Sequence, residues 1–477
     1  MLFNTLEFAI FLPIVFGVYW ALASRLRLQN LWVVAASYLF YGLWNWRYLL
    51  LILLTTASSF ATGRLMDCDD SPKRKIALWV NIAVNVGVLF TFKYFNFFAE
   101  NFTVLLNALG MTADGVTLRL ALPVGISFYT IQAIGYSIDV YFRRIEPCRS
   151  WLPFFAFISF FPQLVAGPIE RAANLLPQFE RRRRFDYAEA VDGCRRILWG
   201  LFKKVVVADS CAAAVDIVYS DFSNLGSTAL ALGAVLFSFQ IYGDFSGYSD
   251  IAIGVGRLFG IRLKDNFRLP YFSRSIREFW ARWHISLTGW FRDYIYIPLG
   301  GNRCGKWRHA GNTVGVFLLS GLWHGAAWPY VAWGALHGWL YMPGIFAGKR
   351  GRRYRVDGPI APGRLLPPFN EAVAMTVTAV IVALGWVVFR SPSMAVAGQY
   401  LARMFIFTGP VLPVYGIEAS AWCVVLLVIE WIQRNRPHVF DIDNVRPAIA
   451  RYIIYWVMLY VIHTHSVSDI QFIYFQF

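Results

Sequence analysis

Residues 310–348 read AGNTVGVFLLSGLWHGAAWPYVAWGALHGWLYMPGIFAG and contain no Asp, Glu, Lys or Arg. A stretch this long and apolar is typical of a membrane-embedded segment. His324 lies near its centre, and an ionisable side chain at that depth is costly, so it is a candidate functional residue. The alternative is a histidine that only hydrogen-bonds within a helical bundle. Gly321, Gly325 and Pro329 flank His324 and predict a helix break just beyond it, which membranes tolerate where the backbone is buried or lines a cavity.

The composition of the whole chain indicates the same class of protein. Hydrophobic residues make up 57% of the 477 residues and charged residues only 15%, whereas soluble domains carry about a quarter charged residues. Apolar spans recur throughout, with approximate cores at 6–23, 31–44, 48–63, 77–98, 121–141, 151–168, 197–219, 227–258, 313–340, 371–390, 417–433 and 452–466. We therefore expect an all-α polytopic membrane protein with about 10–12 spans, some re-entrant or tilted. Residues 1–477 are expected to form a single membrane domain.

The net charge of +16 comes from basic residues in the connections between apolar spans, which is not the pattern of a nucleic-acid-binding face. Short basic clusters lie between the apolar spans, as the positive-inside rule predicts, so we expect membrane lipids and no nucleic acid as partners. The first segment, MLFNTLE, has no basic residue, which predicts an uncleaved first helix with its N-terminus outside. The clusters are Arg25/Arg27, Lys73–Lys75, Arg143/Arg144, Arg181–Arg184 and Lys349–Arg353.

The polar connection at residues 260–308 alternates charged and aromatic residues. Between Ser275 and Trp290 its apolar positions recur at intervals of three and four, which predicts one amphipathic helix. Such a helix lies at the membrane interface or caps a cavity, leading into the catalytic span 310–348, or is a simple surface helix. The apolar positions are Ile276, Phe279, Trp280, Trp283, Leu287 and Trp290.

The histidines suggest acyl-transfer chemistry. A buried histidine is neutral near pH 7 because burial disfavours the charged imidazole, and it can then take a proton from a hydroxyl that attacks a carbonyl. We expect His324 to be this base, with His284 orienting it or binding the developing oxyanion. His309 and His438 lie in polar connections and are expected to be solvated. His463 and His465, near the C-terminus, are given no role.

A polar cluster between apolar runs supplies further candidates to line the site. Residues 240–250 hold two carboxylates and several hydroxyl groups, which either line a reaction tunnel or serve as helix caps and interhelical hydrogen bonds. The six cysteines show no CxxC pair and HExxH is absent, so no metal is expected. The site-lining candidates are Trp323, His337, Asp244, Ser246 and Tyr248.

At these residues the chain resembles the membrane-bound O-acyltransferase family, in particular its bacterial polysaccharide O-acetyltransferase branch. Matching strings run in order through nearly the whole chain, and the long string at 266–303 is highly specific together with Trp-His-Gly. The strings are SYLFYGLWNW (37–46), FKYFNFF (92–98), LPVGISFYTIQAIGYSIDVY (122–141), FFPQLVAGPIER (160–171), FKKVVVAD (202–209), YGDFSGYSDIAIG (242–254), NFRLPYFSRSIREFWARWHISLTGWFRDYIYIPLGGNR (266–303), GLWHGAAWPYVAWGALHG (321–338) and FIYFQF (472–477).

The resemblance implies an irregular helical bundle around a funnel or tunnel in the bacterial inner membrane. It implies that His324 is the family's essential histidine, acting as base or as transient acetyl carrier, and that His284 occupies the position of the family's second polar residue. Acetyl-CoA is the expected cosubstrate, with no bound cofactor. The acceptor is expected to be alginate, cellulose or peptidoglycan, or a periplasmic SGNH-like acetyltransferase that passes the group on. The rival interpretations are a transporter or flippase and a non-catalytic scaffold.

Overall fold

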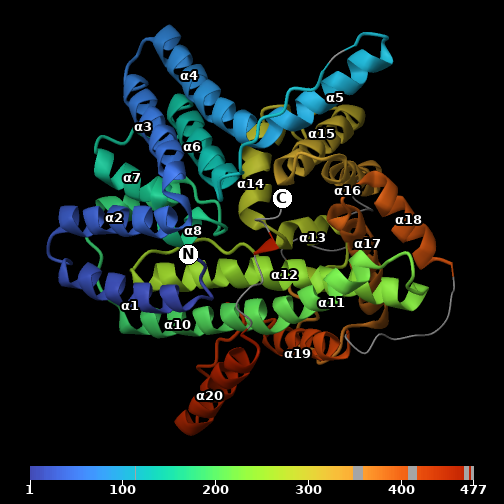
Figure 1. Ribbon diagram of the computed structural model, residues 1–477. Coiled ribbons are helices and arrows are strands. Elements are labelled where there is room, and N and C mark those ends of the chain that lie inside the picture. The colour runs from blue at the N-terminus through green and yellow to red at the C-terminus, as the bar shows by residue number, and fades with distance from the viewer. Residues whose placement is uncertain (113, 348–357, 407–415, 467–471, 474–477) are drawn as a thin grey trace. The chain divides into compact units, whose positions relative to one another are not determined.

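The computed structural model describes residues 1–112, 114–347, 358–406, 416–466 and 472–473 (Figure 1). Every regular element in these ranges is a helix, which confirms the predicted all-α fold. The basic cluster at 349–353, the end of the charge-free stretch at 348 and the last four residues of the C-terminal string lie outside these ranges.

The chain folds into two compact units. The first contains residues 1–187 and 256–263, and the second contains residues 188–255 and 264–477. A single membrane domain stays a prediction, because two compact units can belong to one domain.

The first unit is built from helices of the N-terminal third of the chain. α3, α4 and α6 lie side by side within it (Figure 1). The helices are α1 (Leu6–Ala21), α2 (Leu26–Asn45), η1 (Trp46–Tyr48), α3 (Leu49–Leu65), α4 (Ser71–Leu89), η2 (Phe90–Tyr94), α5 (Phe95–Ala108), α6 (Ile126–Tyr141), α7 (Trp151–Ser159), α8 (Phe161–Leu164) and α9 (Ala172–Glu180).

Buried polar side chains join α3 to α4 in this unit. The amide Nδ2 of Asn81 donates to Ser59 Oγ at 2.8 Å and to Thr62 Oγ1 at 3.2 Å. All three side chains are buried. Small and polar residues of this kind hold helices together in membranes, where no hydrophobic effect drives helix association.

The second unit contains both histidines of the predicted pair. Its helices are α10 (Tyr187–Leu201), η3 (Phe202–Ala208), α11 (Asp209–Ser220), α12 (Ser227–Leu258, which ends in the first unit), η4 (Pro270–Phe272), α13 (Ile276–Arg282), α14 (Ile285–Phe291), η5 (Arg292–Tyr296), α15 (Lys306–His324), α16 (Trp328–Phe346), α17 (Phe369–Arg390), α18 (Met394–Met404), α19 (Ile417–Gln433) and α20 (Ala448–Thr464). The segments η2, η3 and η5 are π-helical, and such segments are frequent at functional sites.

Four helical segments of the described chain are long and apolar enough to cross a membrane. They are residues 26–65, 71–108, 227–258 and 369–390, and the apolar helices α1 and α20 are shorter. Exposed leucine, isoleucine and valine side chains along these segments suit contact with lipid. The chain is therefore a multi-pass helical membrane protein, and its number of spans stays a prediction.

Candidate functional site

The helix that carries His324 ends at this residue. α15 stops at His324, Gly325 is fully extended with φ −162°, and α16 begins at Trp328. Pro329 lies in the first turn of α16, where a missing N–H leaves no hydrogen bond unmade. The predicted helix break beyond His324 is confirmed.

Backbone-to-backbone packing holds α15 against α16 (Figure 1). A Cβ atom on Gly321 would lie 2.2 Å from the carbonyl oxygen of Tyr330, and one on Gly334 would lie 2.3 Å from that of Phe317. Because no side chain fits at such distances, both positions require glycine. The close pairing fixes His324 at the turn between the two helices.

Aromatic rings surround the imidazole of His324. Its ring centroid lies 4.9 Å from Trp323, 5.3 Å from Trp333 and 5.4 Å from Phe389. The residue is only 4% exposed. Such an apolar, water-poor setting strengthens the electrostatic interactions that the imidazole makes with a reacting group.

His284 lies at a break between two short helices, so the prediction of one continuous helix through residues 275–290 is wrong. α13 ends at Arg282 and α14 starts at Ile285. His284 has the left-handed backbone conformation, with φ 45° and ψ 53°. A residue other than glycine is strained there and is held only by its surroundings. The main-chain oxygen of Asn266 accepts a hydrogen bond from the Ile285 amide at 2.9 Å and so supports the new helix start.

Two of the three charged residues of α13, Glu278 and Arg282, are buried rather than solvated. Glu278 is 1% exposed, and its carboxylate binds Arg274 and Arg282, each at 2.9 Å. A simple amphipathic surface helix is therefore wrong for this segment. Glu278, Arg274 and Arg282 form an internal ion-pair cluster, while Arg277 of the same helix is exposed.

Asn266 determines which ring nitrogen of His284 carries the proton. The Asn266 Oδ1 atom accepts from the Ser286 amide at 3.2 Å and from Ser286 Oγ at 2.8 Å, which identifies Oδ1 as the carbonyl oxygen. His284 Nδ1 lies 3.1 Å from this oxygen. Because a carbonyl oxygen only accepts, Nδ1 is the protonated nitrogen and Nε2 of the neutral ring has the lone pair.

His284 and His324 lie in the same aromatic surroundings. The Trp323 ring packs against both imidazoles, with its centroid 5.9 Å from that of His284. Burial lowers the pKa of His284 well below its ordinary value, and the neighbouring His324 lowers this pKa further. The structure therefore brings the two predicted histidines together, with His284 neutral at pH 7.

His337 lies on α16, one helical turn after Trp333. Trp333 packs against His324 and also against His337, at 5.0 Å. Trp280 Nε1 donates to His337 Nδ1 at 3.3 Å. Trp333 therefore links His337 to the histidine pair.

The predicted site-lining residues of α12 contact lysines of η3. Lys204 Nζ lies 2.7 Å from Asp244 Oδ1, and Lys203 Nζ donates to Ser246 Oγ at 2.9 Å. Phe245, which lies between Asp244 and Ser246 in the sequence, packs edge-on against His284 at 4.6 Å. α12 thus contacts His284 through Phe245, while Asp244 and Ser246 take part in interhelical ion pairs and hydrogen bonds.

The described end of the C-terminal segment packs on the same part of α12. Phe472 lies 4.9 Å from the Tyr248 ring, and the Ile473 amide donates to Asp244 Oδ2 at 2.6 Å. Both C-terminal residues are 1% exposed. This segment is therefore part of the second unit's core.

Sequence reasoning gave no role to the buried lysines of η3. Lys204 also pairs with Asp209 at 2.8 Å, and Lys203 pairs with Asp250 at 2.5 Å. The signal was present in FKKVVVAD, because two lysines within an apolar segment need buried acidic partners. Which carboxylates supply them depends on the packing of η3 against α12.

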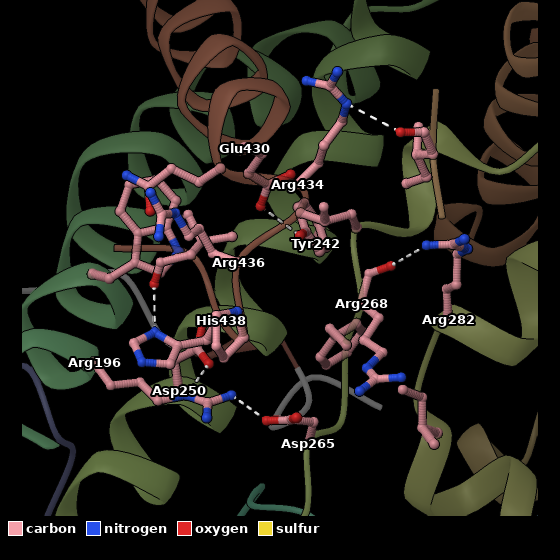
Figure 2. A pocket seen from close by; sticks show the side chains of 18 of the residues that line it. Arg196, Tyr242, Asp250, Asp265, Arg268, Arg282, Glu430, Arg434, Arg436 and His438 are labelled. Carbon is pink, nitrogen blue, oxygen red and sulfur yellow. Dashed lines mark hydrogen bonds and ion pairs between the residues drawn. The ribbon is translucent and has the colours of Figure 1, made fainter. Parts of the chain in front are cut away.

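The second unit contains a cavity of about 510 Å³. One of its walls is formed by residues next to His284. Ile285 and Phe267 line it, and the Phe267 ring lies 6.4 Å from that of His284. Figure 2 shows cationic side chains from α10, from the segment before η4, from α13 and from the segment after α19. The basic residues are Arg196, Lys203, Arg268, Arg282, Arg434 and Arg436, and the carboxylates are Asp250, Asp265 and Glu430.

The cavity has an excess of positive charge. Arg196 pairs with Asp250 at 2.9 Å and with Asp265 at 2.5 Å, and Lys203 also pairs with Asp250. Within the described residues, Arg268 has no carboxylate partner. Three aromatic rings (Trp199, Tyr242 and Phe267) complete the lining, so the cavity suits an anionic ligand with a flat ring.

His438 lines this cavity, so the prediction that it is solvated is wrong. Its side chain is 10% exposed, and Nε2 lies 2.5 Å from Asp192 Oδ1. The polar connection that holds His438 folds back onto α10, which its sequence did not indicate.

One family model and three relatives bear on what this helical membrane protein with a buried histidine pair does. The model of the membrane-bound O-acyltransferase family (MBOAT) matches residues 148–384, which include His284 and His324. The probable alginate O-acetylase of Pseudomonas aeruginosa is 38% identical over 83% of this chain and 73% of its own length. The peptidoglycan O-acetyltransferase of Helicobacter pylori is 32% identical over 92% of this chain and 91% of its own length. The teichoic acid D-alanyltransferase of Bacillus subtilis is 30% identical over 49% of this chain and 61% of its own length.

The protein is thus a multi-pass membrane O-acyltransferase. It belongs to the membrane-bound O-acyltransferase family, as its sequence motifs predicted.

Proposed function

We propose that this protein is an O-acetyltransferase that moves an acetyl group from cytoplasmic acetyl-CoA toward hydroxyl groups of an extracytoplasmic polysaccharide. The acceptor is a glycan of the alginate, cellulose or peptidoglycan type, reached directly or through a periplasmic SGNH-like partner protein. The observation that carries the proposal is the buried pair of His284 and His324 in one aromatic site. The names of two relatives that match most of the chain support acetyl as the group transferred.

In the proposed reaction His324 acts as general base. It takes the proton of the acceptor hydroxyl while that oxygen attacks the thioester carbonyl of the donor. The tetrahedral intermediate then loses CoA as its carbon–sulfur bond breaks, and the proton passes from the imidazole to the leaving thiolate. Trp323, Trp333 and Phe389 exclude water around His324, which protects the thioester from hydrolysis.

The basic cavity supports acetyl-CoA as donor. Its volume of about 510 Å³ lies in the range of small-molecule sites. Arginine forks bind phosphate groups well, and an aromatic wall suits a purine ring. We propose that the phosphates lie near Arg268 and that the thioester end extends past Phe267 toward His284.

The protein is proposed to span the bacterial inner membrane with its N-terminus in the periplasm. The basic clusters that alternate with apolar spans support this orientation. The donor then enters from the cytoplasm and the acceptor from the periplasm.

The test is acetyl-CoA turnover by purified full-length protein in lipid nanodiscs, with alginate, cellulose or peptidoglycan fragments as acceptors. We expect CoA release together with ester-linked acetyl groups on one acceptor. Arg268→Gln should raise the KM for acetyl-CoA by about 10- to 100-fold, because a charge-assisted phosphate contact contributes on the order of 1.5–3 kcal/mol, while kcat changes little.

Arg303→Gln is the matched control. Arg303 is exposed and does not line the cavity, so its KM should equal that of the wild type. Absence of CoA release with all three acceptors, both without and with a periplasmic SGNH-like acetyltransferase added, would contradict the proposal and favour a transporter or a scaffold.

A further inference from the structure

The side chain that holds His284 is itself a candidate for a functional role. We propose that Asn266 is a positioning residue that keeps the proton of His284 on Nδ1, so that Nε2 faces the reaction as a hydrogen-bond acceptor. The inference rests on the proposed function, because it concerns how the second histidine takes part in acyl transfer.

Both the oxygen and the nitrogen of the Asn266 side-chain amide have hydrogen-bond partners. The residue is 1% exposed. Its Oδ1 accepts from Ser286 N–H, Ser286 O–H and His284 Nδ1–H, and its Nδ2 donates to Ser249 Oγ at 3.2 Å. A flipped amide would bring Nδ2 against the Ser286 N–H, donor against donor. The orientation of the amide, and with it the tautomer of His284, is therefore determined.

The backbone of Asn266 supports the same histidine. Its main-chain oxygen accepts from Ile285, the first residue of α14. His284 makes no side-chain hydrogen bond to cap this helix. Asn266 therefore provides both the cap of α14 and the partner of the imidazole, and it stabilises the left-handed conformation of His284.

This tautomer decides between two roles for His284. A neutral imidazole with its proton on Nδ1 has no Nε2–H to offer, so it does not stabilise an oxyanion by donation. It accepts a hydrogen bond instead, from the attacking hydroxyl or from a protonated His324. We therefore assign His284 the role of orienting the group that donates this hydrogen bond, which is the attacking hydroxyl or the protonated His324.

Asn266→Asp tests this assignment with little change in shape. A carboxylate accepts the same three hydrogen bonds, but its charge favours the imidazolium form and raises the pKa of an adjacent histidine by about 1–3 units. The acid limb of the pH–kcat profile should move to higher pH by at least about one unit. The loss of kcat should appear on the acid side of the profile, at pH values where His284 is protonated in the variant and still neutral in the wild type, and kcat should recover as the pH rises, because protonated His284 no longer accepts at Nε2.

Asn266→Ala removes the partner altogether. We expect kcat to fall at least about tenfold at every pH, since a misoriented histidine is not rescued by deprotonation. The KM for acetyl-CoA should stay within about threefold of that of the wild type, because Asn266 does not line the cavity. Asn81→Ala is the control: it removes another fully buried amide with two hydroxyl partners, in the first unit, and should leave the pH profile unchanged.

A second readout needs no substrate. Within the described residues, His324 is the titratable group that lowers the pKa of His284 in addition to burial. The amide of Asn266 and the rings of Phe245, Phe267 and Trp323 also contact His284. The wild-type thermal midpoint should fall as the pH drops below about 6.5, because unfolded His284 then binds a proton that the folded state does not. In Asn266→Asp this acid-induced fall should be smaller.

The outcomes separate this inference from the proposed function. Unshifted kcat and thermal profiles in folded Asn266→Asp would overturn the role of Asn266, even if the wild type transfers acetyl groups. A wild type that releases no CoA would overturn the proposed function, while the thermal profiles still decide the tautomer.

Discussion

At His284, one strained residue combines a backbone break with a side chain aimed into an apolar site. The left-handed conformation places the imidazole between Asn266 and Phe245 instead of on the face of a continuous helix. Strain of this kind is held by surrounding contacts and gathers at functional sites. Here the contacts of His284 come from Asn266, which lies 18 residues earlier in the chain, so the local sequence pattern does not predict them.

The pKa of His284 predicts how stability changes with pH. Its folded pKa lies well below the ordinary value, so the unfolded state binds more protons below about pH 6.5. Stability is complete above that pH and falls as the pH decreases toward the folded pKa, by up to about 1.4 kcal/mol per pH unit. His284→Asn should weaken this fall, because Asn does not titrate and tolerates the left-handed conformation. Thermal unfolding in detergent between pH 5 and pH 8 measures the effect, and parallel curves for both proteins would contradict it.

At the scale of elements, the α15–α16 pair sets the position of His324. Gly334→Ala places a Cβ atom 2.3 Å from the Phe317 carbonyl oxygen, so the two helices must separate. We expect a stability loss of about 1–3 kcal/mol and a reduced rate of acetyl transfer per folded molecule. Gly315→Ala on α15 is the control, because a Cβ there meets nothing within 4 Å. Equal thermal midpoints for the two variants would show that the close packing does not matter.

The sequence predicted one of the two breaks near the histidines. The break after His324 follows from Pro329, whose missing N–H limits it to the first turn of a helix. The break at His284 is invisible to periodicity, because the apolar spacing of residues 275–290 continues across it. Hydrogen bonds from Asn266 override that spacing, and they depend on tertiary packing.

For the whole molecule, composition and span pattern were enough to predict an all-α membrane protein, and the motifs were enough to predict its family. The cavity could not be predicted from composition, span pattern or motifs. Its walls come from α10, from the segment before α14 and from the segment after α19 (Figure 2), which are far apart in sequence. The same holds for His438, whose polar connection predicted a solvated side chain and which instead binds Asp192.

His324 is the general base of the proposed reaction, so the decisive measurement is acetyl transfer by His324→Ala beside the wild type. Both proteins are compared in nanodiscs at equal folded concentration, with His309→Ala, on the same helix, as control. The account predicts that kcat falls at least about 100-fold in His324→Ala, as expected for loss of a general base, and is unchanged in His309→Ala. Wild-type acetyl transfer by a folded His324→Ala protein would contradict the account and make His324 a structural residue.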